Sequence, residues 1–161
     1  MTATDLPTTP VRTDPREVVE AFLAAMAAGD ADAAEALIDE DILYVNVSLP
    51  PMRGASEVRK VLRALDKPWA GFGVCVHAIA AEGPVVLTER TDILELGPVH
   101  AQFWVWGRFE VVDGRITLWR DSFDYVDLLR GTARGIAAAV FPSLRPAAPT
   151  PDAAPGRPPR R

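Results

Sequence analysis

Four strand-like segments follow one another between residues 71 and 125, and no other feature constrains the fold as strongly. They are rich in Val, Ile, Thr and aromatic residues, and they cover residues 71–81, 85–96, 100–112 and 115–125. Short turns containing Gly or Pro separate them, and the last turn, Asp113-Gly114, has the composition of a tight hairpin. Strands joined by turns this short lie antiparallel to their neighbours. The sequence therefore predicts a four-stranded antiparallel meander.

The residues before the meander show the spacing of amphipathic helices. Asp14-Pro15 has the N-cap and first-turn proline of a helix, and its apolar face consists of Val18, Val19, Phe22, Leu23 and Met26. Asp30 is placed to cap a second helix, on which we expect Ala33, Ala34, Leu37 and Ile38. The remaining predicted elements are a strand over residues 42–47, a helix over residues 54–66 and a final helix over residues 126–141. Helices first and strands afterwards indicate an α+β domain.

Two segments flank this domain without a periodic pattern. Residues 1–13 are rich in Thr and Pro, and residues 142–161 contain seven prolines in twenty positions, a composition typical of disordered tails. The chain has 161 residues, of which 48% are apolar and 24% charged, as expected for one globular domain. We therefore predict one domain over residues 14–141 between two disordered tails.

Charge and composition argue against several partners. The net charge is −5, and residues 142–161 hold four arginines against one aspartate, so residues 1–141 carry about eight negative charges in excess. That excess repels phosphate backbones, which argues against nucleic acid. No apolar run is long enough to span a bilayer and the first residues lack a signal-peptide pattern, so we expect a cytoplasmic protein without membrane insertion. The single cysteine suggests neither a disulfide nor a metal site, and the motifs of serine hydrolases, dinucleotide-binding proteins and P-loop proteins are absent.

Two of the predicted strands place charged residues on apolar faces. Because side chains alternate along a strand, Arg90 and Asp92 share a face with several aliphatic residues. By the same rule Asp121 lies in an aromatic row with Trp119 and Phe123. An unpaired carboxylate on such a face is costly, so it needs a partner or a function. Periodicity alone leaves two interpretations open, a buried ion-pair network without chemistry or a catalytic group.

Other polar and aromatic residues are less informative by themselves. Tyr44 and Asn46 share one face of the early strand, and from the residues alone we interpret them as polar positions of an edge strand. His77 and His100 form no recognisable pair with a carboxylate, which favours surface or half-buried roles. Three strand tryptophans are interpreted as core residues, with a ligand cavity as the alternative: Trp104, Trp106 and Trp119.

Three segments resemble the signature stretches of the limonene-1,2-epoxide hydrolase family. They read YVNVSLPPMRG at residues 44–54, TERTDIL at residues 88–94 and WRDSFD at residues 119–124. Their order and spacing also match, and the resemblance extends over about residues 14–130. It leaves out both tails and residues 132–141.

The resemblance implies a fold and a mechanism. The fold is the cone-shaped nuclear-transport-factor-2-like (SnoaL-like) α+β barrel, a strongly curved mixed sheet around N-terminal helices, often dimeric through the outer sheet face. Carried over by position, Asp121 is the general base that deprotonates water and Asp92 the acid that protonates the epoxide oxygen, with Arg90 between them. Tyr44 and Asn46 hold the attacking water. The implied reaction converts a lipophilic epoxide to a vicinal diol in one step, without metal, cofactor or covalent intermediate.

Two other functions are open on the same fold. A proton-transfer enzyme similar to ketosteroid isomerases or polyketide cyclases would use one aspartate as its base, but it also needs an oxyanion hole, which Arg90, Asp92 and Asp121 fit poorly. In a non-catalytic lipid-binding module, these three charged residues would only stabilise a cavity. For the enzyme we expect a bulky lipophilic substrate that is terpenoid, sterol-like or fatty acyl. The helices at 54–66 and 126–141 and Trp69 would then set the size of the pocket.

Overall fold

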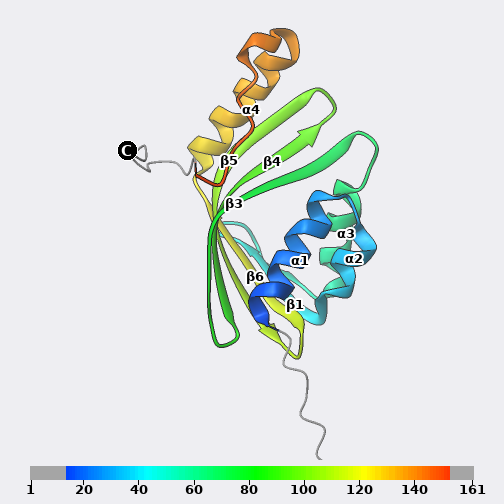
Figure 1. The fold of residues 1–161 in the computed structure, drawn as a ribbon. Coiled ribbons are helices and arrows are strands. Elements are labelled where there is room, and N and C mark those ends of the chain that lie inside the picture. Colours follow the sequence, from blue (N-terminus) through cyan, green and yellow to red (C-terminus); the bar gives the residue numbers. More distant parts are fainter. Residues whose placement is uncertain (1–13, 153–161) are drawn as a thin grey trace, which may run out of the picture.

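The computed structural model describes residues 14–152, which form four α-helices and one six-stranded sheet (Figure 1). In chain order the elements are α1 (Pro15–Ala27), α2 (Ala31–Ala36), β1 (Ile38–Asn46), β2 (Met52–Arg53), α3 (Ala55–Leu65), β3 (Ala70–Glu82), β4 (Val85–Leu96), β5 (Val99–Val112), β6 (Arg115–Phe123) and α4 (Tyr125–Val140), followed by a 3₁₀ turn (Pro142–Leu144). Within this described part of the chain, no helix combines the length and the apolar character needed to cross a membrane.

The strands lie in the order β2-β1-β6-β5-β4-β3. The three successive pairs β3–β4, β4–β5 and β5–β6 are antiparallel, which confirms the predicted meander. Asp113 and Gly114 have φ values of 50° and 75°, as a tight hairpin turn requires. Strand β1 runs parallel to β6 and antiparallel to β2. The sheet is therefore mixed, as predicted.

The sheet curves strongly, and α1, α2 and α3 lie on its concave side (Figure 1). This arrangement confirms the predicted cone-shaped α+β fold around N-terminal helices. The sheet is not closed into a barrel, however, because β2 and β3 are its two free edges. Helix α1 packs against β3 on the concave side. Helix α3 contacts both of these edge strands, β2 and β3.

Helix α1 supplies the centre of the core. Asp14 Oδ1 accepts a hydrogen bond from the backbone N–H of Arg16, which confirms the predicted N-cap, and the five predicted apolar residues are all buried. Phe22 packs edge-on against Phe109 and Trp119, with ring centroids 6.3 and 5.1 Å away. The helix thereby fixes Trp119, an aromatic residue in the strand of Asp121.

The end of the second helix differs from the prediction. The spacing predicts Leu37 and Ile38 on the helix, but α2 ends before them and Ile38 opens β1, four residues ahead of the predicted strand at 42–47. Parallel pairing with Ile116 buries the branched side chain of Ile38, and Arg115 Nη1 donates to the Ile38 carbonyl oxygen at 3.2 Å. These partners are remote in sequence, so local periodicity could not reveal them.

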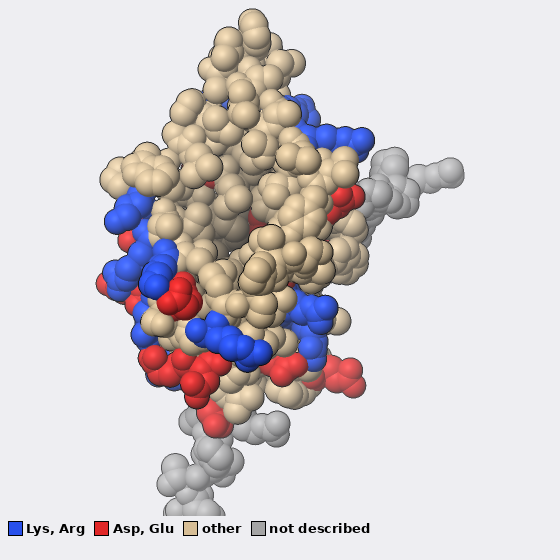
Figure 2. Space-filling model, turned by 180° about the vertical axis from the view of Figure 1, so that it is seen from behind, with Lys and Arg blue, Asp and Glu red and all other residues tan. Residues whose placement is uncertain are grey.

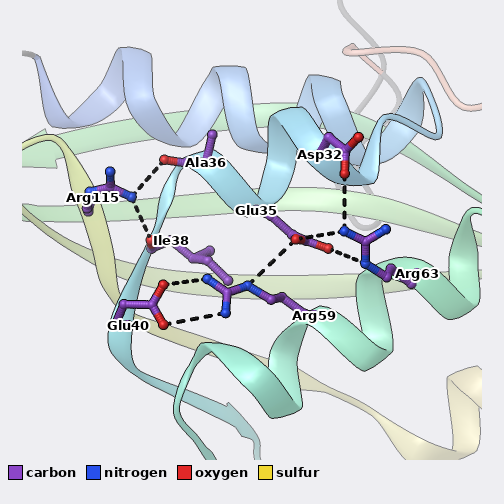
Figure 3. A network of polar contacts seen from close by, with 8 residues as sticks. All are labelled: Asp32, Glu35, Ala36, Ile38, Glu40, Arg59, Arg63 and Arg115. Atoms are coloured by element: carbon purple, nitrogen blue, oxygen red, sulfur yellow. Dashed lines mark hydrogen bonds and ion pairs between the residues drawn. The ribbon is translucent and has the colours of Figure 1, made fainter.

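An ion-pair network ties α2 to α3 and β1 (Figure 3). The Glu35 carboxylate on α2, with a side chain only 13% exposed, lies 2.8 Å from Arg63 Nε and 3.6 Å from Arg59 Nε on α3. Arg63 also pairs with Asp32, and Arg59 with Glu40 of β1. The network therefore holds α3 against the first half of β1.

Helix α4 lies apart from the other helices and beside the first half of β5 (Figure 1). Strand β6 pairs only with the second half of β5, so the first half would otherwise have a free edge. Asp127 Oδ2 accepts from the backbone N–H of Trp104 at 3.0 Å. A Cβ atom at Gly131 or Gly135 would lie 2.2 or 2.6 Å from carbonyl oxygens of β5, so these glycines permit the close approach. The predicted final helix is confirmed, and it covers the edge of the sheet.

Residues 142–152, which the composition assigns to a C-terminal tail, return toward the sheet after α4. Three of their carbonyl oxygens, those of Leu144, Ala147 and Pro151, lie within hydrogen-bonding distance of the side chains of Arg134, Gln102 and His77 respectively. A proline-rich stretch without periodicity gives no sign of such contacts. The predicted tail residues 1–13 and 153–161 lie outside the described residues.

Candidate active site

The five residues singled out in the sequence meet on the concave face of the sheet. Tyr44 and Asn46 come from β1, Arg90 and Asp92 from β4, and Asp121 from β6. The parallel register of β1 and β6 places Asn46 directly beside Asp121. Strand β5 separates β4 from β6, so the Arg90 side chain crosses β5 to reach Asp121.

The guanidinium of Arg90 joins the two carboxylates. It is fully buried, and its Nε donates to Asp92 Oδ1 at 2.8 Å. Its Nη2 lies 3.2 Å from Asp92 Oδ2 and 2.6 Å from Asp121 Oδ2, and its Nη1 donates to Thr88 Oγ1 at 3.0 Å. Burial alone would lower the pKa of Arg90, but the charges of Asp121 and Asp92 outweigh it and raise the pKa above its ordinary value. Arg90 therefore stays positively charged.

Asp92 is the carboxyl group that holds a proton more readily than usual. Burial raises its pKa to about 6, against the opposing effect of Arg90, and the negative charge of Asp121 acts in the same direction as burial. Two carboxylates around one guanidinium are neutral as a set only when one of them is protonated. Of the carboxyl groups around Arg90, Asp92 is therefore the one whose surroundings make it hold a proton more tightly than a free carboxyl group does.

The two oxygens of Asp121 have different surroundings. Oδ2 accepts from the indole N–H of Trp119 at 2.8 Å and lies 2.6 Å from Arg90 Nη2. Oδ1 is buried and has no hydrogen-bond partner among the described residues. An unpaired buried acceptor is costly, and Asp121 lines the cavity described below. Oδ1 is therefore the oxygen of Asp121 that is left without a hydrogen-bond partner, in a residue that lines that cavity.

Tyr44 and Asn46 form the polar group beside Asp121. Asn46 Nδ2 donates to the Tyr44 hydroxyl oxygen at 2.8 Å, and the Tyr44 ring stacks on Trp119 with centroids 4.0 Å apart. Burial raises the pKa of Tyr44, and the charge of Asp121 adds to the effect, so the phenol keeps its proton. The predicted edge position is wrong, because pairing of β1 with β2 and β6 makes β1 an interior strand.

An apolar cavity of about 280 Å³ opens onto four of the five residues, Tyr44, Asn46, Asp92 and Asp121, whereas Arg90 is not part of its wall. Val61 and Leu65 of α3 and Leu128 of α4 line it, which confirms that the two predicted helices close the pocket. Figure 2 shows a hollow within a largely uncharged stretch of surface, while charged side chains gather on the lower part of the same face. The site is thus an apolar pocket with a charged group at its wall.

Some predictions about the surroundings of the site are wrong. Trp119 lines the cavity, but Trp106 is 52% exposed and does not belong to the core. Trp69 is also exposed and lies outside the cavity wall. The histidines take the surface or half-buried positions expected for them, and His77 contacts Thr91 and residue 151. The expectation that neither pairs with a carboxylate is wrong for His100, whose Nδ1 lies 3.2 Å from Glu95 Oε1, outside the cavity wall.

Sequence reasoning missed two polar contacts that complete the site, the Thr88 hydroxyl on Arg90 and the Trp119 N–H on Asp121. Strand alternation places both residues on the inner face, but it does not identify their hydrogen bonds. A second hollow of about 380 Å³, between the ends of α1 and α3 and the start of β3, contains none of the five residues. Within residues 14–152, no group of three or more His, Cys, Asp and Glu side chains is arranged to hold a metal ion.

The fold and cavity define a class of protein. A curved, open mixed sheet with three N-terminal helices on its concave side and an apolar pocket between them is a nuclear-transport-factor-2-like fold. The solved structure of a protein of this class and of unknown function from Cytophaga hutchinsonii aligns with a TM-score of 0.61 at 18% identity, over 75% of this chain and 99% of that chain. At this identity the likeness concerns the fold alone.

Closer relatives identify the family. Residues 13–134 match the family model described as the limonene-1,2-epoxide hydrolase catalytic domain. Epoxide hydrolase EphG of Mycobacterium tuberculosis is 49% identical over 127 residues, which cover 79% of this chain and 85% of that protein. The solved structure of an M. tuberculosis LEH-like epoxide hydrolase aligns with a TM-score of 0.80 and 46% identity, over 87% of this chain and 99% of that chain. The chain belongs to the limonene-1,2-epoxide hydrolase family, which confirms the predicted resemblance, and it is an enzyme of the epoxide hydrolase class.

Proposed function

We propose that this enzyme adds water to a compact lipophilic epoxide in one step, with Asp121 as the general base and Asp92 as the general acid. One observation carries the proposal: a single buried guanidinium is shared by two carboxyl groups that line the same apolar cavity. Concerted opening of an epoxide needs a basic group on one side of the ring and an acidic group on the other. The surroundings of Asp121 and Asp92 support this division of roles.

The attacking water would lie between Asp121, Tyr44 and Asn46. It would donate one hydrogen to the free Oδ1 of Asp121 and accept one from the Tyr44 hydroxyl, whose oxygen is already occupied by the Asn46 amide. The Asn46 carbonyl oxygen would accept the second hydrogen. This leaves one lone pair of the water for attack on a ring carbon.

The bonds and protons balance without a covalent intermediate. As the water oxygen bonds to the ring carbon, its proton moves to Asp121 Oδ1, the bond from that carbon to the epoxide oxygen breaks, and the epoxide oxygen takes the proton of Asp92. The diol leaves an enzyme with the proton on Asp121 instead of Asp92. Transfer of this proton between the two carboxyl groups then restores the starting state, while Arg90 keeps the set near neutrality throughout.

The size and composition of the cavity support a compact, lipophilic substrate. A volume of about 280 Å³ lies just below the roughly 300–1,000 Å³ typical of small-molecule sites, which is smaller than the expected bulky substrate would need. A cyclic terpenoid epoxide fits that scale, whereas a sterol would have to project from the open mouth. A panel of epoxides of graded size tests this: kcat/KM is expected to peak at compact rings, and a maximum at sterol epoxides would contradict it.

A single turnover in ¹⁸O-water, with enzyme in excess, tests the one-step mechanism. Direct attack puts ¹⁸O into the diol formed in that first turnover. A route through an ester on an aspartate would instead give an unlabelled first diol and leave the label on the enzyme. An absence of any diol from epoxides of all sizes would favour a proton-transfer enzyme or a lipid-binding module instead.

Replacement of Arg90 by lysine tests the role of the guanidinium. Lysine keeps the charge but cannot contact both carboxylates through a planar fork. We expect Arg90→Lys to lose most of its activity while retaining its fold by circular dichroism. Retention of more than about half of the wild-type rate would contradict the bridging role.

We also propose that the enzyme is a homodimer. The resemblance implies pairing through the outer sheet face, and exposed apolar side chains on β5 and on the helix along its edge support an apolar interface. Trp106 is exposed on β5, and α4 has a row of exposed apolar side chains at helical spacing: Val126, Leu129, Ile136 and Val140. Light scattering is expected to give twice the chain mass for the wild type and a shift to monomer for Leu129→Glu. Cytoplasmic location remains a prediction, to be tested by cell fractionation.

A further inference from the structure

The path of the Arg90 side chain to Asp121 depends on the residue of β5 that the side chain crosses. The register places Gly107 of β5 opposite Thr88 of β4 on one side and opposite Asp121 of β6 on the other. Arg90 follows Thr88 by two residues and points to the same face. On its way to Asp121, the guanidinium therefore passes over the one position of β5 that has no side chain.

The space above Gly107 is fully taken by the groups around it. A Cβ atom there would lie 2.1 Å from Arg90 Nη1, 2.4 Å from Thr88 Oγ1 and 3.0 Å from Phe109 Cε2. Arginine ends are ordinarily flexible, but this one is buried and held by two carboxylates. A methyl group at position 107 would thus displace the guanidinium from its partners.

The backbone gives no other reason for glycine at this position. Gly107 lacks the positive φ that five other glycines of the described residues have. Inside a strand, glycine is unfavourable compared with residues that have side chains. Its presence is explained by the passage of Arg90.

Thr88 holds the nitrogen of Arg90 that faces neither carboxylate. Its hydroxyl oxygen accepts from Nη1 at 3.0 Å, and the residue is buried. Without that hydroxyl, a buried N–H of a charged group would lose the partner that the structure gives it. Neither Thr88 nor Gly107 lines the cavity, so neither touches the substrate.

We infer that Gly107 and Thr88 are positioning residues of the reaction: Gly107 opens the passage by which Arg90 reaches Asp121, and Thr88 anchors the guanidinium in that passage. The inference rests on the proposed function, because it concerns how the acid and base share one arginine. It predicts a loss of kcat without loss of substrate binding. It also predicts a change at Asp92, since the Arg90 charge lowers the pKa of that carboxyl group.

Gly107→Ala is the first test, with Gly73→Ala as its control. A Cβ atom at Gly73, also within a strand of the sheet, would have the Ile93 side chain as its nearest neighbour, at 3.3 Å. For Gly107→Ala we expect kcat to fall about a hundredfold or more with KM little changed. The pKa of Asp92, followed by ¹³C-carboxyl NMR titration, should rise by about one unit or more. Gly73→Ala should keep the wild-type kcat and titration.

Thr88→Val and Thr88→Ser form a second test that does not depend on how well Gly107→Ala folds. Valine removes the hydroxyl and should lower kcat about tenfold. Serine keeps the hydroxyl and should restore kcat to within about twofold of the wild type. Equal kcat values for the valine variant and the wild type would overturn the role of Thr88.

The NMR titration separates this inference from the proposed function, because it does not require turnover. A rise of the Asp92 pKa in Gly107→Ala, in a protein that hydrolyses no epoxide, would refute the proposed function and support the positioning role. An unchanged Asp92 pKa and kcat in a folded Gly107→Ala variant of an active hydrolase would refute the positioning role alone.

Discussion

Titration of Asp92 gives the sharpest prediction about the mechanism. The proposed acid must be protonated to give its proton to the epoxide oxygen, and burial raises its pKa to about 6. Activity should therefore decline as pH rises past that value. At pH 8, two units above it, about 1% of the free enzyme would still have the proton. We expect kcat/KM to fall about tenfold per pH unit on this limb and to be about a hundredfold below its maximum at pH 8.

The pH profile of kcat should differ from that of kcat/KM. The kcat profile reports groups in the enzyme–substrate complex, and kcat/KM those of the free enzyme. A lipophilic substrate excludes water from the cavity, and its oxygen accepts a hydrogen bond from the protonated acid. Both effects favour the protonated form of Asp92 in the enzyme–substrate complex. The alkaline decline of kcat should therefore occur at higher pH than the alkaline decline of kcat/KM. The apparent pKa values read from these profiles describe the coupled pair of carboxyl groups and not one residue in isolation.

Initial rates of diol formation, measured from about pH 5 to pH 9 at constant ionic strength and corrected for uncatalysed opening, test this prediction. Asp92→Asn is the control, because its residual rate should lack the alkaline limb. A kcat/KM that stays flat between about pH 6 and pH 9 would refute the role of Asp92 as the acid.

The same titration has a consequence for stability. The reference pKa is 3.8 and the folded value about 6, so the folded state holds this proton more tightly than the unfolded chain does. The contribution of Asp92 to the free energy of unfolding is therefore largest below about pH 4 and declines as pH rises to about 6, opposite to the behaviour of an ion-paired aspartate with a lowered pKa.

Three further predictions concern single residues. Asp92→Asn and Asp121→Asn should each lower kcat by about 10²–10⁴-fold in steady-state assays, and the double variant should be little worse than the worse single one, because both groups serve one step. Glu35→Gln should lower the free energy of unfolding in urea by about 1 kcal/mol, less at high salt, without changing kcat, because the residue belongs to the α2–α3 ion pairs and not to the cavity. Trp119→Phe should lower kcat about tenfold while the fold is kept.

The alternation of side chains along a strand accounts for most of what the sequence predicts about the site. It places Arg90 beside Asp92 on one face and Asp121 in an aromatic row, and the structure has both features. Alternation says nothing about the order of strands, however. The contact between Arg90 and Asp121 requires β5 to lie between β4 and β6, which the short turns of the predicted meander already indicate. The approach of Asn46 to Asp121 requires β1 to pair with β6, and for this pairing the sequence offers only the family resemblance.

Two errors in the predicted fold have the same origin. Ile38 fits the helical spacing of α2, but a parallel partner in β6 determines its conformation. The sequence around Tyr44 suggests an edge strand because the two strands that pair with β1 are hard to recognise from it. Strand β2 has only two residues, and β6 lies far along the chain. Gly107 resembles any other strand glycine until the side chain above it is placed. Long-range pairing therefore limits prediction more than local propensity does.

The prediction for Trp119 follows from the hydrogen bonds of Asp121. Its Oδ2 accepts from both the indole N–H and Arg90, and these two donors fix the carboxylate so that Oδ1 is left for the water. Phenylalanine would keep an aromatic ring against Phe22 and Tyr44 but remove the indole donor, so the carboxylate could turn about its remaining contact. A hydrogen bond to a charged group contributes about 1.5–3 kcal/mol.

Because Arg90 still holds the same oxygen of Asp121 in Trp119→Phe, we expect a loss at the lower end of that range, about tenfold in kcat. The control is Trp104→Phe, since the Trp104 indole has no hydrogen-bond partner among the described residues and the residue does not line the cavity. Both variants remove one indole N–H from the sheet, but only one of these groups holds the proposed base. If the two variants had equal kcat values, the indole of Trp119 would contribute only packing, and the orientation of Asp121 would have to depend on Arg90 alone.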